Sequence, residues 1–264
     1  MKLVARPAAT LILLRQAAAG PETLMLQRVR SAAFLGGAYV FPGGAVDASD
    51  SDARLLRRVL GLTEQAASER LGIAGAIAYY VAALRECFEE GGVLIACDAA
   101  GRGIAPERAA ALLQFRDHPF AEFLEREDLY LPAGELAYYG HWITAPNRPR
   151  RFDTRFFVAL APEGQEGAHD AVETVHALWI ETNSARSSGG RRRGSARRRL
   201  STERVHGESR PSAAGGTMSF WNSSPSRDFS MSFHFRYTGS GLRWQLTTHT
   251  VLPLTIWVLG STHV

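Results

Sequence analysis

Lysine is almost absent from this sequence, because Lys2 is the one lysine among its 30 basic residues. We interpret this bias as the mark of a GC-rich gene rather than of a function. Cysteine is nearly as scarce: Cys87 and Cys97 are too few for a disulfide framework, which favours the cytoplasm or another reducing compartment. No apolar run approaches 18 residues, so no membrane-spanning helix is predicted. The run at 8–14 is short and closed by Arg15, which favours a buried strand over a signal peptide.

The charge is distributed unevenly along the 264 residues. Hydrophobic content of 45% and charged content of 21% are ordinary for a soluble globular protein. Residues 1–182 carry 18 basic and 23 acidic residues, a net charge of −5, whereas residues 183–264 carry 12 basic and three acidic residues, a net charge of +9. We therefore predict a folded domain over 1–182 and an atypical tail over 183–264.

The tail is rich in Arg, Ser and Gly between residues 184 and 217, and it includes the arginine runs 191–193 and 197–199. Such a composition cannot bury a core and is typical of disorder. An out-of-frame stretch of a GC-rich gene has the same composition, and we favour that interpretation. A nucleic-acid-binding tail is the alternative, since basic runs contact phosphates. We expect only weak, unselective nucleic-acid binding.

The most informative stretch of the folded domain runs from residue 82 to residue 93. The apolar residues at and before it recur with helical period, which predicts a helix over 73–90. The residues predicted to share its buried face are Ile77, Tyr80, Val81, Leu84, Cys87 and Phe88. The glycine pair at 91–92 is expected to end the helix, because glycine readily adopts the left-handed conformation found at helix ends.

Three carboxylates gather on the opposite face of this helix. Glu86, Glu89 and Glu90 form an i, i+3, i+4 set, and Arg85 lies beside them, one turn before Glu89. The set is either a solvated helix face or a site for a hard divalent cation, since Mg²⁺ prefers carboxylates together with waters and phosphates. An upstream Phe-Pro-Gly-Gly turn at 41–44 favours the second interpretation, because glycine lets backbone approach a ligand closely.

With both features in view, the chain resembles the Nudix hydrolases. Their signature is a Gly, five residues, a Glu, seven residues and then R-E-U-x-E-E-x-G-U, where U is bulky and apolar. Residues 85–93 match the second half, with Cys87 as a small member of the apolar class. The first half departs from the signature: six residues after Gly44 stands Asp50, and 34 residues separate Asp50 from Arg85. An insertion inside the signature is a feature of the branch similar to coenzyme A and acyl-CoA diphosphatases.

The resemblance implies a fold and a reaction. It implies an α/β/α sandwich with a mixed sheet over 1–182, with a helical insertion at 50–75. It implies that Mg²⁺ or Mn²⁺ assists hydrolysis of a diphosphate linkage, with coenzyme A or acyl-CoA cleaved to phosphopantetheine and 3′,5′-ADP. Two alternatives stay open: ADP-ribose or another nucleoside diphosphate derivative as substrate, and a fold that binds nucleic acid without cleaving it.

The resemblance also implies roles for single residues. The implied catalytic residues are Arg85, Glu86 and Glu89, with Glu86 or Glu89 as the base. The implied metal ligands are Glu86, Glu89, Glu90 and, outside the signature, Glu173. The implied substrate-binding residues are Arg28, Gly43, Gly44, Arg151 and Arg155.

Some of these residues have an ordinary structural alternative. Arg28 matches a motif of the coenzyme A-directed enzymes, but Ala33 stands where that motif has a second Arg, so Arg28 is equally well explained as a surface residue at a strand end. Glu173 is equally well explained as a surface loop residue. His169 and His176 are interpreted as structural.

The remaining patterns predict the other elements of the domain. Proline at 119 divides a helical region at 106–127 into two helices. The insertion is predicted to form two short helices, at 52–60 and 63–71, which serve either as a flap over the site or as a spacer. Strands are predicted at 8–14, 23–29, 136–144, 151–160 and 174–180, the first two as a hairpin.

Overall fold

The computed structural model describes residues 4–18, 20–31, 37–147 and 149–181 in full, together with the backbone of four strands between residues 215 and 258. The chain divides into two compact units. The first unit comprises Met1–Gln16 and Glu22–Ile180, and the second comprises Ala17–Pro21 and Glu181–Val264.

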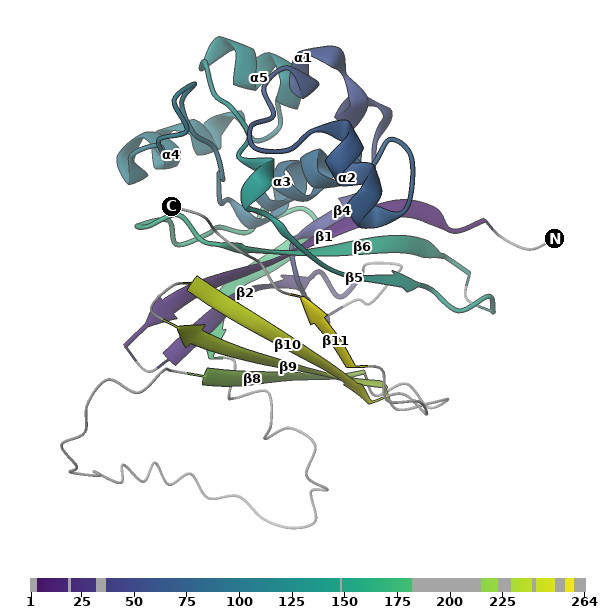
Figure 1. Cartoon of the computed structure of the whole chain (residues 1–264). Helices are drawn as coiled ribbons and strands as arrows, with labels where there is room; N and C mark the ends of the chain where they lie inside the picture. The colour runs from purple at the N-terminus through teal and green to yellow at the C-terminus, as the bar shows by residue number, and fades with distance from the viewer. Residues whose placement is uncertain are drawn as a thin grey trace. The chain divides into compact units, whose positions relative to one another are not determined.

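The first unit is built on a seven-stranded mixed sheet (Figure 1). Its strands are β1 (Arg6–Ala17), β2 (Gly20–Arg28), β3 (Tyr39–Val40), β4 (Gly43–Ala45), β5 (Ala137–Ile143), β6 (Phe152–Leu160) and β7 (Thr174–Glu181). They follow the order β3-β2-β1-β6-β5, with β4 paired to β1 and β7 paired to β2. The β1–β6 pair is parallel, whereas the β1–β4, β2–β3 and β5–β6 pairs are antiparallel. The mixed sheet and the adjacent strands β1 and β2 confirm the predictions.

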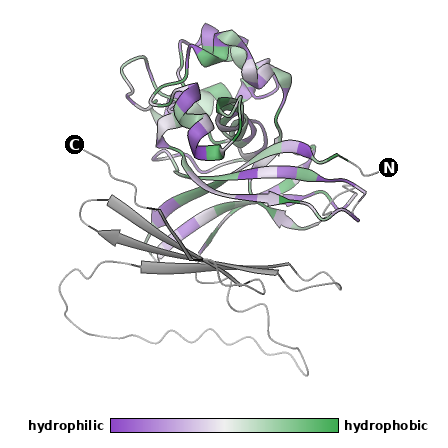
Figure 2. Cartoon of the chain, turned by 45° about the vertical axis from the view of Figure 1, so that its right-hand side comes forward, coloured by the Kyte–Doolittle hydropathy of each residue, from purple (hydrophilic) through white to green (hydrophobic). Residues whose placement is uncertain are grey.

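The helices of the first unit all lie on one side of this sheet (Figure 1). They are α1 (Ala53–Leu56), α2 (Glu64–Leu71), α3 (Ile77–Gly91), α4 (Pro106–Leu112) and α5 (Phe120–Arg126), with 3₁₀ turns η1 (Ala48–Ser51), η2 (Leu113–Phe115) and η3 (Ala133–Glu135). Hydrophobic and hydrophilic residues are mixed along both the strands and the helices (Figure 2). A second helical layer of the sandwich is not among the described residues, since residues 182–214, which follow β7, lie outside them.

Helix α3 lies at the centre of the core, as its apolar face predicts. All six residues predicted for that face are buried. Tyr80 packs on Phe157 of β6 with ring centroids 4.4 Å apart, and Phe88 stacks on Phe123 of α5 at 5.1 Å. The helix is thus held between the sheet and the other helices, which keeps its carboxylates in a constant position.

The ends of α3 are set by two different devices. The helix begins at Ile77, four residues later than predicted, because the Glu64 carboxylate accepts hydrogen bonds from the N–H groups of Ala76 and Ile77, at 3.0 and 3.2 Å. A negative charge at this end also favours the helix dipole. Gly92 ends the helix with φ 64°, as predicted.

The insertion packs into the helical layer instead of forming a separate flap. Thr63 caps α2 as its position predicts, accepting from the N–H of Ala66 at 3.2 Å. Helix α1 ends at Leu56 and is shorter than predicted. Leu55 and Leu71 belong to the main core cluster, and the Leu60 N–H donates to the carbonyl of Leu131 at 2.8 Å. The insertion therefore contributes to the core.

The second unit contains four described strands, which the sequence did not predict. They are β8 (Gly215–Asn222), β9 (Phe229–Thr238), β10 (Gly241–His249) and β11 (Thr255–Val258), and they form an antiparallel sheet in that order. The arginine runs lie outside the described residues, so the interpretation of that stretch as disordered or out of frame stays a prediction. Within the described part of the chain, no helix is both long enough and apolar enough to cross a membrane.

Candidate active site

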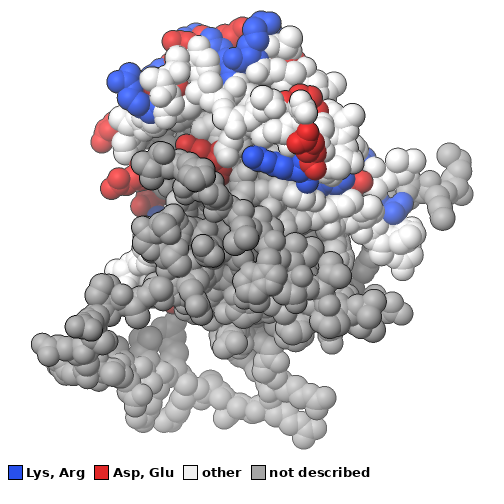
Figure 3. All heavy atoms as spheres, viewed as in Figure 1, with Lys and Arg blue, Asp and Glu red and all other residues white. Residues whose placement is uncertain are grey.

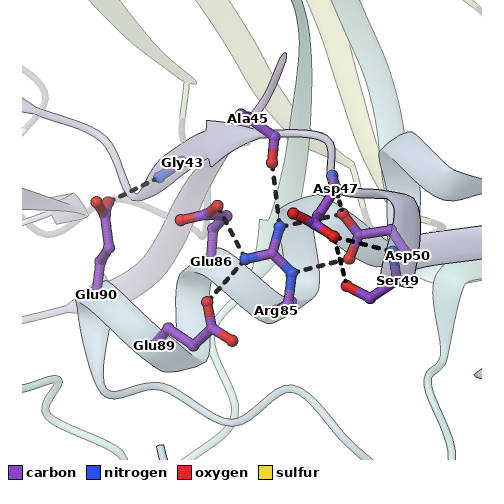
Figure 4. Close-up of polar contacts among 9 residues, drawn as sticks. All are labelled: Gly43, Ala45, Asp47, Ser49, Asp50, Arg85, Glu86, Glu89 and Glu90. Carbon is purple, nitrogen blue, oxygen red and sulfur yellow. Dashed lines mark hydrogen bonds and ion pairs between the residues drawn. The ribbon is translucent and has the colours of Figure 1, made fainter. Parts of the chain in front are cut away.

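Arg85 lies at the centre of the candidate site and joins three elements (Figure 4). Its Nε and Nη2 donate to the two carboxylate oxygens of Asp50 in η1, at 2.8 and 3.0 Å. Nη2 also donates to the Ala45 carbonyl of β4 at 3.1 Å. Nη1 donates to Glu86 at 2.9 Å and to Glu89 at 2.7 Å, both on α3. The guanidinium therefore orients two of the predicted carboxylates.

Asp50 is the functional residue to which the sequence assigned no role. It is fully buried, and its other contact is the N–H of Asp47, which donates to Oδ2 at 2.7 Å. The signal was present, because Asp50 occupies the position six residues after Gly44 where the Nudix signature has Glu. The departure in residue type and the long insertion obscured it. Asp50 binds Arg85 from the side opposite Glu86 and Glu89 (Figure 4).

The two glycines of β4 allow the strand to approach α3 closely. The Gly43 N–H donates to Oε2 of Glu90 at 3.2 Å, and a Cβ on Gly43 would lie 2.5 Å from the Ala9 carbonyl oxygen. A Cβ on Gly44 would lie 2.6 Å from Cδ of Glu86, well inside contact distance. A larger residue is therefore excluded at Gly43 by β1, and at Gly44 by the Glu86 carboxylate in its present position.

The carboxylates carry more negative charge than Arg85 neutralises. Burial raises the pKa of Glu86 to about 7, against the opposing effect of Arg85. Burial, and then the charge of Glu86, raise the pKa of Glu90 to about 8. Burial also raises the pKa of Glu89. One guanidinium faces Asp50 and two of these glutamates, so the site has a shortage of positive charge.

These residues fit a hard divalent cation whose coordination shell is completed by water and substrate. No three His, Cys, Asp or Glu side chains converge as a ready-made metal cluster in the described ranges. Mg²⁺ does not require one, because it binds through one or two carboxylates and otherwise keeps waters and substrate phosphates. The oxygen donors and the uncompensated charge at Glu86 and Glu90 are what such an ion needs.

Arg28 and Glu173 are brought together beside Glu90. Arg28 Nη2 bonds to Oε2 of Glu173 at 3.1 Å, and both side chains act electrostatically on the Glu90 carboxylate. The Arg28 side chain is 20% exposed and that of Glu173 is 58% exposed. The Glu173 carboxylate thus contacts Arg28 here, and its assignment as a metal ligand stays a prediction.

Arg151 and Arg155 lie apart from the carboxylates. Ala9 of β1 pairs with Gly44 on one side and with Arg155 on the other, so β1 separates Arg155 from β4. The Arg155 guanidinium is buried and pairs with Asp153, which also bonds to the His141 ring. Arg151 Nε donates to the carbonyl of Thr144 at 3.0 Å. The substrate role of these arginines stays a prediction.

His169 and His176 lie with their ring centroids 6.4 Å apart, and Nδ1 of His169 accepts from the N–H of Ala171 at 3.1 Å. These contacts agree with the structural interpretation.

Gly44→Ala is expected to lower kcat by about 10²-fold. The added methyl would displace the Glu86 carboxylate, and a misplacement of about 1 Å can have an effect of that size. Gly103→Ala is the matched control, because nothing lies within 4 Å of its Cβ position. Steady-state kinetics and thermal unfolding of both variants provide the comparison. Equal turnover by the two variants would contradict the proposed role of the close β4–α3 approach.

Acidic and basic side chains are interspersed over the described surface of the face in Figure 3. Among the described residues visible on that face, the basic side chains form no extended patch of the kind that contacts a nucleic-acid backbone.

No family model matches the sequence. Among solved structures, the crystal structure of a NUDIX hydrolase from Alicyclobacillus acidocaldarius is 33% identical, with a TM-score of 0.57, and the match covers 69% of this chain and 81% of that one. Among curated proteins, acyl-coenzyme A diphosphatase NUDT19 of Homo sapiens is 29% identical over 65% of this chain, and that of Gallus gallus is 28% identical over 60%. The chain spans about half the length of these two relatives, 56% and 53% respectively.

Proposed function

The chain belongs to the Nudix hydrolases, and from this premise we propose that it hydrolyses the diphosphate linkage of coenzyme A or acyl-CoA, releasing phosphopantetheine and 3′,5′-ADP. The observation that carries the proposed hydrolysis is the cluster in which Arg85 binds Asp50, Glu86 and Glu89. The likeness to the two acyl-coenzyme A diphosphatases supports this choice of substrate.

In the proposed mechanism, Glu86, Glu89 and Glu90 would hold Mg²⁺ or Mn²⁺, and Glu173 would be a further ligand while its Oε2 stays bonded to Arg28. The ion would neutralise charge on the diphosphate and lower the pKa of the attacking water. Glu86 or Glu89 acts as the base or orients that water, directly or through a hydrogen-bonded intermediary. Arg85 keeps both carboxylates in place, since it donates to each through Nη1.

The substrate is proposed to contact the two glycines of β4 and an arginine. Gly43 and Gly44 shape the turn against α3, because a larger residue would overlap β1 at Gly43 and the Glu86 carboxylate at Gly44. Arg28, Arg151 and Arg155 are the candidates for binding the phosphates of coenzyme A. Arginine suits this role because its planar guanidinium matches phosphate oxygens in pairs.

The proposal is tested by offering coenzyme A, an acyl-CoA and ADP-ribose to the purified chain with Mg²⁺ or Mn²⁺. Mass spectrometry should detect phosphopantetheine and 3′,5′-ADP from the first substrate. Cleavage of ADP-ribose with coenzyme A left intact would support the alternative Nudix substrate class instead. Failure of every diphosphate in the presence of both metals would contradict the catalytic assignment.

Dephospho-CoA is expected to be a poorer substrate than coenzyme A. A charge-assisted hydrogen bond between an arginine and the 3′-phosphate contributes about 1.5–3 kcal/mol, so kcat/KM should be roughly 10- to 100-fold lower for the substrate that lacks this phosphate. The two values are measured side by side under the same metal concentration. Equal values would show that no arginine reads the 3′-phosphate.

A further inference from the structure

The loop at residues 167–174 runs along the end of α3 that carries Glu90. The Ala168 N–H donates to the Gly91 carbonyl at 2.8 Å. Arg116 adds two hydrogen bonds, from Nη1 to the His169 carbonyl at 3.0 Å and from Nη2 to the Ala168 carbonyl at 3.2 Å. The first part of the loop is therefore fixed to the catalytic helix and to the segment that follows η2.

Asp170 fixes the second part of the loop. Its Oδ1 accepts from the backbone N–H groups of Val172, Glu173 and Thr174, at 3.0, 3.1 and 2.8 Å. It also accepts from the Thr174 hydroxyl at 2.9 Å. Between these contacts, Ala171 has φ 63°, in the left-handed region that residues other than glycine rarely adopt. The side chain of Asp170 thus maintains a backbone turn that the sequence would not otherwise favour.

The turn presents Glu173 to Arg28. The Val29 N–H donates to the Glu173 carbonyl at 2.9 Å, and the Glu173 carboxylate binds Arg28 Nη2 at 3.1 Å. The loop that makes these two contacts is itself bonded to the Gly91 carbonyl at the end of α3, so the guanidinium is held near that end, where its charge also acts on Glu90. Arg28 Nε is buried and makes no hydrogen bond within the described residues, while the side chain as a whole is 20% exposed and so remains open to a ligand.

We propose that Arg28 binds the diphosphate that is cleaved, and that Asp170 is a positioning residue that sets Arg28 for this contact by way of Glu173. The position of Arg28 beside Glu90 separates this role from recognition of the 3′-phosphate. The chemistry is that of a guanidinium and a phosphate oxygen. The inference rests on the proposed diphosphate hydrolysis but not on what the diphosphate is attached to.

The test compares Asp170→Ala, Arg28→Gln and the double variant, with coenzyme A and dephospho-CoA as substrates. Arg28→Gln should raise KM by about 10- to 100-fold, and by the same factor for both substrates, because both contain the diphosphate. Asp170→Ala should raise KM by about 10-fold with a much smaller change in kcat. In the double variant the Asp170 substitution should add nothing to that of Arg28, because the two residues act on one contact.

Two further variants separate positioning from general stability. Asp98 is the matched control, since its Oδ1 accepts from the N–H groups of Ala100 and Arg102, both at 2.9 Å, in a comparable loop whose side-chain bonds involve none of the residues of the candidate site. Asp98→Ala should leave KM unchanged. Asp170→Asn keeps an acceptor oxygen for the same N–H groups and should restore KM toward the unsubstituted value.

Three results would overturn the inference: an unchanged KM in Asp170→Ala, independent effects in the double variant, or an Arg28→Gln effect confined to coenzyme A. If the chain cleaves ADP-ribose and not coenzyme A, the proposed substrate fails. The same variants are then compared on ADP-ribose, for which Arg28→Gln and Asp170→Ala should again raise KM.

Discussion

Glu90→Gln is expected to lower kcat by at least about 10²-fold while leaving the fold intact. Glutamine removes a negative charge from the buried group that needs a cation, and metal-assisted steps lose several kcal/mol without the ion. The amide oxygen can still accept from the Gly43 N–H, which now donates to Oε2 of Glu90. The substitution also removes repulsion between Glu90 and Glu86, so the free energy of unfolding in metal-free buffer should not decrease. Glu89→Gln is expected to reduce kcat similarly.

The measurement combines turnover at saturating Mg²⁺ with thermal unfolding in the presence of chelator and of Mg²⁺. An ion that binds the folded state raises the unfolding temperature, so this second readout reports on the metal without reference to activity. The unsubstituted chain should gain stability from Mg²⁺, and Glu90→Gln should gain little. Glu125→Gln is the control, because this glutamate of α5 forms only a long, exposed pair with Arg54 at 3.8 Å. Normal turnover and an undiminished Mg²⁺ shift in both Glu89→Gln and Glu90→Gln would refute the metal assignment.

Arg85→Met is expected to reduce both stability and activity. Breaking a buried ion pair from one side typically lowers the free energy of unfolding by about 3–5 kcal/mol, because the partner charge is left buried. The Asp50 side chain is fully buried and the Arg85 side chain is 11% exposed, so this pair meets that condition. Turnover should also fall by at least about 10²-fold, since Glu86 and Glu89 lose the donor that orients them.

A double-mutant cycle with Asp50→Asn tests the physical reason for this effect. Removing both charges leaves no uncompensated partner on the Asp50 side, so the double variant should be less destabilised than the sum of the single variants, by about 0.5–3 kcal/mol. Urea unfolding supplies the free energies. Arg54→Met is the control, because its pair with Asp52 is solvent-exposed and exposed pairs contribute little to stability. Strict additivity of Arg85→Met and Asp50→Asn would contradict the coupling.

Much of the first unit could be predicted because its signals are local. The apolar period of α3 defined its buried face, and Thr63, Pro106 and Gly92 marked helix ends through backbone preferences that act within a few residues. The strands β1, β2, β5, β6 and β7 were predicted for the same reason. The start of α3 was misplaced, because the Glu64 carboxylate that caps it comes from the preceding helix and leaves no local pattern.

The candidate site was only partly predictable for a similar reason. Arg85, Glu86, Glu89 and Glu90 are close in sequence, so helical spacing alone places them together. Asp50 is 35 residues away from Arg85 in the sequence, and only the folded structure shows that its carboxylate binds the Arg85 guanidinium. The proximity of Arg28 to Glu173, 145 residues apart, arises in the same way.

The sequence by itself determined helix α3, its carboxylate face, most strands of the sheet and the family resemblance, because periodicity and a contiguous motif are properties of short segments. The tertiary structure alone decided that Asp50 completes the arginine cluster, that the insertion packs into the core, and that Arg155 is buried against Asp153 while Arg28 lies beside Glu90. Charges compensate one another, and apolar surfaces are buried, between segments far apart in the chain. Local patterns in the sequence do not show which segments will meet, and these contacts are established only when the strands pair and the helices pack on them.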